Sequence, residues 1–133
     1  MAFILCDTDF LIKATTEPLP ELAKFLQDSG YQITTLDKIQ AELKGLRLSK
    51  NSSTARKAKA ALRSIESGSV KVLKYDNSTS KKADADALLI DFAQRSKEKV
   101  VVATLDHTIL SFLEKKRLPY LTLRNDKPLL KAF

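Results

Sequence analysis

The sequence predicts an α/β fold: a three-layer α/β/α sandwich with a mostly parallel central sheet. Short apolar segments alternate with amphipathic segments of roughly ten to fifteen residues, a pattern that indicates βαβ units. Residues 100–103 are uniformly apolar, as expected of a central strand that helices cover on both faces. Both observations favour parallel strands, because a crossover helix returns the chain to the end of the sheet where the previous strand began.

Apolar runs and the residues that interrupt them define the first elements. Residues 3–6 form an apolar run too short for a helix and predict a buried strand that ends at Asp7. Pro18 and Pro20 open an apolar-patterned segment that stops at Gly30, which predicts a helix. Residues 31–34 predict the second strand.

Two helices are expected in the middle of the chain. Apolar residues at offsets of three, seven and ten mark one face of the first: Leu36, Ile39, Leu43 and Leu46. A polar turn is expected at residues 48–53. Residues 53–67 then repeat the helical spacing up to Gly68, and the polar face of this second helix is basic.

The C-terminal half continues the alternation. The expected elements are a strand at 70–74, a polar loop at 76–82, a helix at 84–95, a strand at 100–103, a helix at 107–117 and a final strand at 119–123.

The length and composition suit one domain. With 133 residues, 44% hydrophobic and 29% charged, the chain can bury one core, so a single domain over residues 1–133 is expected. No run reaches the roughly 18 apolar residues that span a bilayer, and no basic region precedes the first apolar run. A soluble, cytoplasmic protein with no membrane partner is therefore expected.

Residue counts exclude several kinds of site. Cys6 is the only cysteine and His107 the only histidine, which excludes disulfide frameworks and zinc sites built from Cys and His clusters. Any metal must therefore be held by oxygen. The 23 Lys and Arg against 16 Asp and Glu give a net charge of +7, which favours a polyanionic partner such as RNA.

Two acids follow predicted strands. Asp7 ends the first strand, and Asp106 comes shortly after residues 100–103. Ligand sites of parallel sheets lie beyond the carboxyl ends of the strands, so the two acids are expected at one edge. Asp7 is also followed by more apolar chain, and an acid between two buried segments requires a partner. Asp106 has a second interpretation, since either it or Thr104 could cap the next helix.

Two further acids lie within predicted helices. At about 100° per residue, Asp86 shares a stripe with Leu89 and Ile90, so that a carboxylate heads the apolar face. Helix capping by Asp86 or by Asp84 explains this as well as metal binding does. Glu42 lies at the edge of the apolar face of its helix, where a glutamate is usually solvated.

Taken together, four acids from four segments form a pattern that stability alone seldom requires. They are Asp7, Glu42, Asp86 and Asp106. Such a cluster would repel itself unless cations were bound, and a set made only of carboxylates suits Mg²⁺ or Mn²⁺.

Four motifs, in order along the chain, resemble those of the PIN-domain nucleases. They are FILCDTDFLI, LDKIQAELKGL, ADADALLIDFA and VVATLDHTIL. The resemblance covers essentially the whole chain. It implies an endoribonuclease in which one or two Mg²⁺ or Mn²⁺ ions activate water to hydrolyse a phosphodiester bond.

By this resemblance Asp7, Glu42, Asp86 and Asp106 are the catalytic residues. Metal binding falls to Asp7, Asp86 and Asp106, whereas Glu42 serves a second metal or a water network. Three neighbours are expected to hold these ligands in place. Thr104 matches the family's small hydroxyl residue, Asp9 stands where the family often has Asn, and Asp84 is a second acid two positions before the expected one.

A narrower resemblance concerns residues 53–72 and the C-terminal PYLTLR. These segments are similar to archaeal PIN proteins related to rRNA-processing endonucleases of the small-subunit processome, lineages that also resemble VapC-type toxins. The resemblance implies a role in rRNA processing or RNA turnover. The alternative is a toxin ribonuclease with an antitoxin partner. The resemblance to PIN proteins also implies pairing as a homodimer.

RNA binding is expected on the basic helical face and beside the acidic helix start. The residues are Arg56, Lys57, Lys59 and Arg63, with Lys81 and Lys82. For each of them the alternative is an ordinary solvated surface.

Two other functions stay open. An apolar strand followed by Asp7, Thr8 and Asp9 also resembles the first motif of haloacid-dehalogenase-type phosphatases, in which Asp7 would be a nucleophile. Leu11 departs from that motif, which has Thr or Val there. A noncatalytic RNA-binding or assembly protein with the PIN fold would keep the basic charge and bind RNA without needing its acids.

Overall fold

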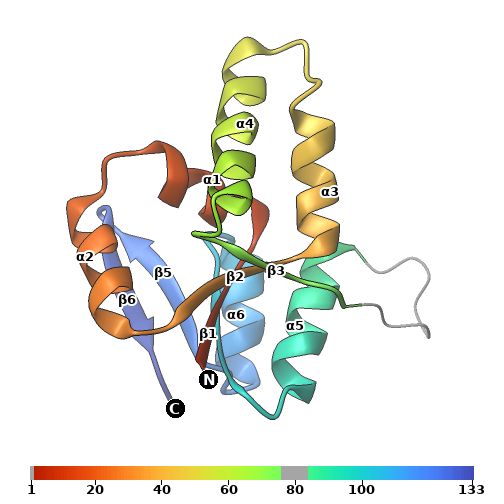
Figure 1. Cartoon of the computed structure of the whole chain (residues 1–133). Helices are drawn as coiled ribbons and strands as arrows, with labels where there is room; N and C mark the ends of the chain where they lie inside the picture. Colours follow the sequence, from red (N-terminus) through yellow and green to blue (C-terminus); the bar gives the residue numbers. More distant parts are fainter. Residues whose placement is uncertain (1, 76–83) are drawn as a thin grey trace.

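A six-stranded sheet forms the centre of the computed structural model, which describes residues 2–75 and 84–133 (Figure 1). The strand order is β3-β2-β1-β4-β5-β6. Every neighbouring pair is parallel except β5 and β6. The strands are β1 (Ala2–Cys6), β2 (Gln32–Leu36), β3 (Lys71–Leu73), β4 (Lys99–Ala103), β5 (Tyr120–Arg124) and β6 (Lys127–Lys131).

Six helices occupy the connections in the described part of the chain. They are α1 (Thr8–Thr16), α2 (Pro20–Ser29), α3 (Asp37–Leu46), α4 (Ser52–Glu66), α5 (Ala85–Arg95) and α6 (His107–Lys115). The chain moves outward from β1 to β3 through α1–α4, then back to β4 and on to β5 through α5 and α6. Since such crossovers are right-handed, α1–α4 cover one face and α5 and α6 the other. The predicted α/β/α sandwich is confirmed.

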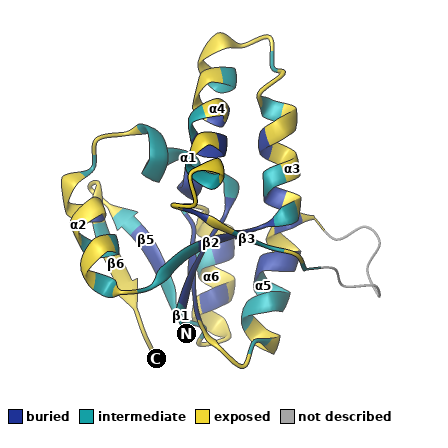
Figure 2. Ribbon diagram, viewed as in Figure 1, coloured by how far each residue is buried: buried dark blue, intermediate teal, exposed yellow. Residues whose placement is uncertain are grey.

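The core lies on both faces of the central strands (Figure 2). Most of β1 and β4 is buried, as predicted for strands covered on both sides. Cys6 packs in this core. A smaller apolar cluster on the α6 side joins Val102 to Ile109 and Leu113. No helix in the described residues is both long and apolar enough to cross a membrane.

Two elements were not predicted. The apolar residues after Asp7 belong to helix α1, which Asp7 caps by accepting a hydrogen bond from the Phe10 N–H. The strand expected to be final is followed by the antiparallel strand β6, which contains Pro128. A proline and flanking lysines suit an edge strand but do not give the alternation from which strands are predicted. The polar loop expected at 76–82 lies outside the described residues.

The strand order reverses between β1 and β4, and this topological switch point positions the candidate site. The chain leaves β1 toward one edge and leaves β4 toward the other, so the connections diverge at the carboxyl ends of these two strands. Cys6 lies opposite Ala103, and the Asp7 N–H donates to the Ala103 carbonyl at 3.0 Å. The residues that follow β1 and β4 are therefore held side by side.

The packing of α4 gives a test of the fold. This helix packs against both α1 and α3, and Ala58 is fully buried on it. We expect Ala58→Leu to lower the free energy of unfolding by about 1–3 kcal/mol, because the added methylenes have no space between the helices. Urea unfolding would measure this change in the free energy of unfolding. The control is Ala41→Leu on the exposed side of α3, with an expected change of about 0.5 kcal/mol or less. Equal effects would contradict the packing.

Candidate functional site

An acidic pocket of about 310 Å³ lies at the carboxyl ends of β1 and β4. It is polar, and its walls come from the starts of α1, α5 and α6 and from the middle of α3. The lining residues are Asp7, Thr8, Asp9, Glu42, Leu46, Asp84, Ala85, Asp86 and Asp106. The structure thus brings together all four acids of the predicted catalytic set, with Asp9 and Asp84 beside them.

Asp7 is the most enclosed acid of the pocket. Only 5% of its surface is exposed, and both of its carboxylate oxygens accept hydrogen bonds. Oδ1 accepts from the Phe10 N–H at 2.8 Å, and Oδ2 accepts from the Thr104 hydroxyl. The carboxylate is therefore fixed in orientation by the first turn of α1 and by the end of β4.

Thr104 connects two of the predicted metal ligands. Its buried hydroxyl donates to Asp7, and the same oxygen accepts from the Asp106 N–H at 3.1 Å. Its side chain is not part of the pocket lining. The Thr104 hydroxyl therefore contacts the carboxylate of Asp7 and the backbone N–H of Asp106, a position from which it could hold both acids in place.

Asp106, and not Thr104, caps α6. Its Oδ1 accepts from the N–H groups of Thr108 at 2.8 Å and Ile109 at 3.3 Å, while its side chain stays exposed at the pocket. His107 is the exposed first residue of the helix.

The start of α5 separates the two acids whose roles the sequence left open. Asp84 is the cap, because its Oδ1 accepts from the Ala87 N–H at 2.8 Å. Asp86 lies in the first turn and is exposed at the pocket. The apolar stripe predicted below it packs in the core through Leu89 and Ile90, and Asp86 stands at the exposed head of that stripe, where it lines the pocket.

Glu42 is exposed on α3, and its Oε2 accepts from the Thr8 hydroxyl at 2.7 Å. Thr8 is a pocket residue that the sequence analysis did not single out. Once α1 is recognised, its position directly after the capping Asp7 places it in the first turn of a helix that faces the pocket. The hydrogen bond joins α1 to α3 across the site.

The acids affect one another electrostatically. Burial raises the pKa of Asp7 to about 6, against the hydrogen bonds from Thr104 and Phe10, and the charges of Asp9 and Asp86 raise it further. The pKa of Asp86 is also raised, first by partial burial and then by the charges of four other acids: Asp84, Asp106, Glu42 and Asp9. The pocket is therefore a region of negative potential in a basic protein.

The donor chemistry of the pocket fits a hard divalent cation, because its ionisable residues are all carboxylates and are flanked by a hydroxyl. A cation would relieve the repulsion that raises the pKa of Asp7 and Asp86. Among the described residues, however, no three Asp, Glu, His or Cys side chains are arranged to hold a metal ion as they stand.

The basic residues predicted to bind RNA are exposed on α4, but they do not form one surface. Arg56, Lys59 and Arg63 line a second pocket of about 400 Å³, whereas Lys57 is not part of its lining. The same pocket includes Arg47 and Lys50, which the sequence analysis did not predict. The signal that could have found them is the absence of any Asp or Glu from residues 47–65. Lys81 and Lys82 lie outside the described residues.

The raised pKa of Asp7 gives a test of its environment. An acid whose pKa is higher in the folded state stabilises the protein below its unfolded pKa, near 4, and this contribution is lost as pH rises through 6. In EDTA, wild-type stability should therefore fall by about 2–3 kcal/mol between pH 4 and 7 through this group. Asp7→Asn should lack that fall and be more stable than wild type at pH 7.

Urea unfolding at several pH values would measure the difference between the two proteins. The control is Asp28→Asn, which removes an exposed acid of α2 and should follow the wild-type curve. Parallel curves for wild type and Asp7→Asn would show that the carboxyl of Asp7 does not titrate abnormally.

No protein-family model matches the chain, and neither does any curated protein sequence. Among solved structures, the chain is similar to the PIN domain endonuclease Utp24, with a TM-score of 0.73 and 21% sequence identity. The alignment covers 98% of this chain and 92% of that chain. At this identity the likeness establishes architecture, and the chain has the PIN-domain fold that its sequence motifs predict.

Proposed function

We propose that the protein is a divalent-metal-dependent endoribonuclease whose active site is the acidic pocket. The observation that carries the proposal is the convergence of Asp7, Glu42, Asp86 and Asp106 on one pocket at the switch point of a parallel sheet. Paired carboxylates also occur for structural reasons. Here, however, an enclosed acid with a raised pKa faces several others in a chain of net charge +7, an arrangement that a bound cation would stabilise.

Asp7, Asp86 and Asp106 would hold Mg²⁺ or Mn²⁺, as one ion or two. When bound, the metal supplies Lewis-acid chemistry: it makes a water molecule more acidic and neutralises charge on the phosphate. Asp7 orients the site, because Phe10 and Thr104 fix both of its oxygens. Glu42 is held by Thr8 on the opposite wall and would bind a second ion or position water.

The substrate would be RNA, with an rRNA precursor as one candidate. The net charge of +7 and the basic side chains along α4 favour a polyanion. The sequence resemblance to rRNA-processing PIN proteins and the likeness to a PIN domain endonuclease support the same class of reaction. A VapC-type toxin would use the same chemistry. Co-purification of a small antitoxin would distinguish that role.

Cleavage of RNA tests the proposed activity. A mixed pool of single-stranded and structured RNA should be cut in Mg²⁺ or Mn²⁺ and left intact in EDTA. Asp7→Asn should reduce the cleavage rate by at least about 100-fold, since losing a ligand should cost more than losing a residue that supports one. Asp28→Asn makes the same chemical change outside the pocket and should cut at the wild-type rate.

RNA binding without cleavage by the wild type in any metal would contradict the nuclease and favour a noncatalytic RNA-binding protein. Trapping of an aspartyl-phosphate on Asp7 would instead support the phosphatase alternative. Both results can be told apart from misfolding by circular dichroism of the same samples.

Thr104 gives a second test, directed at positioning. Thr104→Val keeps the shape of the side chain but removes the hydroxyl that donates to Asp7 and accepts from the Asp106 N–H. We expect cleavage to fall about 10- to 100-fold, with the metal concentration for half-maximal activity raised. Thr104→Ser restores the hydroxyl and should recover most of the cleavage rate and of the metal affinity. If Thr104→Ser is as impaired as Thr104→Val, the residue acts through packing alone.

A further inference from the structure

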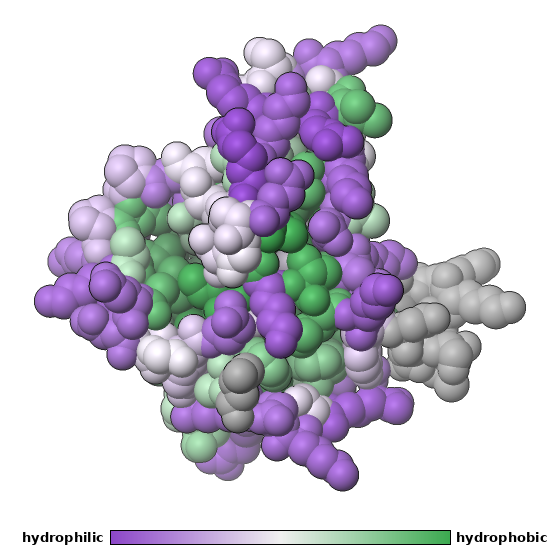
Figure 3. Space-filling view, in the orientation of Figure 1, coloured by the Kyte–Doolittle hydropathy of each residue, from purple (hydrophilic) through white to green (hydrophobic). Residues whose placement is uncertain are grey.

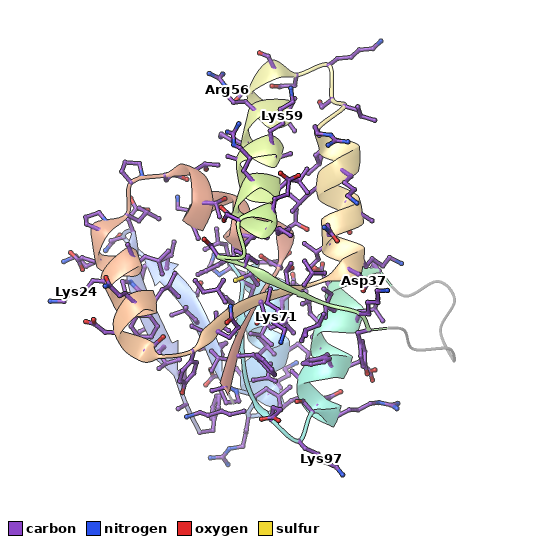
Figure 4. All side chains as sticks on the ribbon, viewed as in Figure 1. Lys24, Asp37, Arg56, Lys59, Lys71 and Lys97 are labelled. Atoms are coloured by element: carbon purple, nitrogen blue, oxygen red, sulfur yellow. The ribbon has the colours of Figure 1, made fainter. Side chains whose placement is uncertain are left out.

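The second pocket is a basic groove at the junction of α3 and α4, which project together from the sheet (Figures 1 and 4). Arg47 and Lys50 contribute from the end of α3 and the following turn. Arg56, Lys59 and Arg63 contribute from α4. Figure 3 shows the hydrophilic surface over this projecting part of the molecule. We call these five side chains, with Leu48, Ser49, Ser52 and Ala55 that line the same pocket, the basic groove.

The positive charge of the basic groove is not neutralised by the protein. Residues 47–65 contain no Asp or Glu. None of the five basic side chains takes part in an ion pair within the described residues. A solvated helix usually mixes the two signs of charge, and such mixing also supports the helix through pairs one turn apart. Here that support is absent, so the charges are free to contact a ligand.

The cations of the groove form one row along α4 that continues into the turn before this helix. Arg56, Lys59 and Arg63 follow one side of α4 at intervals of three and four residues, which spreads their positions over about 10 Å of helix. Arg47 and Lys50 stand at the end of this row, where the chain turns between the helices. A row of fixed cations of this length fits several successive phosphates better than one isolated anion.

The neutral residues of the groove indicate what part of a nucleic acid it would contact. Ser49 and Ser52 line it, and the Ser49 oxygen accepts from the Asn51 N–H, which leaves the Ser49 proton available to donate outward. Hydroxyl and cationic side chains are the usual partners of phosphate oxygens. The lining contains no aromatic residue. Grooves that hold single strands commonly add aromatic side chains on which bases stack, and this groove lacks that component.

The basic groove begins where the acidic pocket ends. Leu46 lines the acidic pocket, and the next residue, Arg47, lines the basic groove. The two sites therefore meet at the C-terminal end of α3, where one would hold a metal and the other a sugar-phosphate backbone.

Building on the proposed nuclease, we propose that the basic groove binds the backbone of a double-stranded RNA segment beside the bond that the acidic pocket cuts. The contacts are to phosphates, so binding is independent of base sequence. A duplex presents about twice the phosphate density of a single strand, which favours it over unpaired RNA. The substrate is then a structured RNA whose helical part docks on α3 and α4.

Binding in EDTA tests this without cleavage. Fluorescence anisotropy would compare a 20-base-pair RNA duplex, roughly two helical turns, with one of its strands alone. We expect the duplex to bind several-fold more tightly. Arg56→Gln with Lys59→Gln should weaken duplex binding roughly 10- to 30-fold at 0.15 M salt and reduce the salt slope by about 2, one for each lost phosphate contact. Circular dichroism would verify folding.

A double variant of equal charge provides the control. Lys24→Gln with Lys97→Gln lies on α2 and before β4, away from the groove (Figure 4), and should change binding less than twofold. Lys57 gives a finer comparison, because it is on α4 but outside the groove lining. Lys57→Gln should bind more tightly than Lys59→Gln.

Three outcomes would overturn the proposed role of the basic groove. They are equal losses of duplex affinity in the two double variants, equal losses of affinity for Lys57→Gln and Lys59→Gln, or single strands bound as tightly as duplex. Failure of the nuclease is distinguishable from these. If no metal supports cleavage but duplex binding still depends on Arg56 and Lys59, the groove stands without the enzyme. If the groove variants cut RNA at the wild-type rate, the nuclease proposal stands and only the proposed role of the basic groove is wrong.

Discussion

The hydrogen bond from the Thr104 hydroxyl to the Asp7 carboxylate joins the ends of β1 and β4 at the topological switch point of the sheet. Residues 97 positions apart are brought together there, and both are buried. A charge in this position has little contact with water, so its cost is reduced mainly by Thr104 and the Phe10 N–H. The same oxygen of Thr104 holds the backbone of Asp106. Displacing this one hydroxyl would therefore disturb two walls of the acidic pocket.

Helix N-termini explain how the fold tolerates so many acids in one place. Asp7, Asp84 and Asp106 each cap a helix, and each accepts the capping hydrogen bonds through Oδ1. The partial positive charge at a helix N-terminus stabilises a carboxylate, which offsets part of the repulsion among them. Capping and metal binding are thus compatible roles. For Asp84 and Asp106 the capping bonds occupy one oxygen, and the other oxygen can turn to a cation.

Local patterns carried most of the fold prediction, and long-range contacts account for what was missed. Gly30 and Gly68 both take positive φ at helix ends, as their placement after amphipathic segments predicted. Helix α1 was missed because the apolar residues after Asp9 were interpreted only as a second buried segment, although Asp7 with Phe10 at helix position N3 makes an ordinary cap. Asp7 and Asp106 were predictable from strand ends, whereas Glu42 and Asp86 lie in helices and entered the set through the resemblance to PIN-domain motifs. Their division of roles was not predictable, because Asp84 and Asp86 differ only in which one reaches the Ala87 N–H.

The separation of the acidic pocket from the basic groove affects how a nuclease with this site would bind RNA. Acids alone would repel RNA from the pocket, since phosphate and carboxylate carry the same sign. Cations beyond Leu46 can hold the backbone at a distance from the acids, so that only one phosphate has to enter the negative region, where a metal would neutralise it. Affinity and chemistry then reside in different side chains. Cutting the strand would then free the part that only the acidic pocket had engaged, while the part held by the basic groove would keep its phosphate contacts.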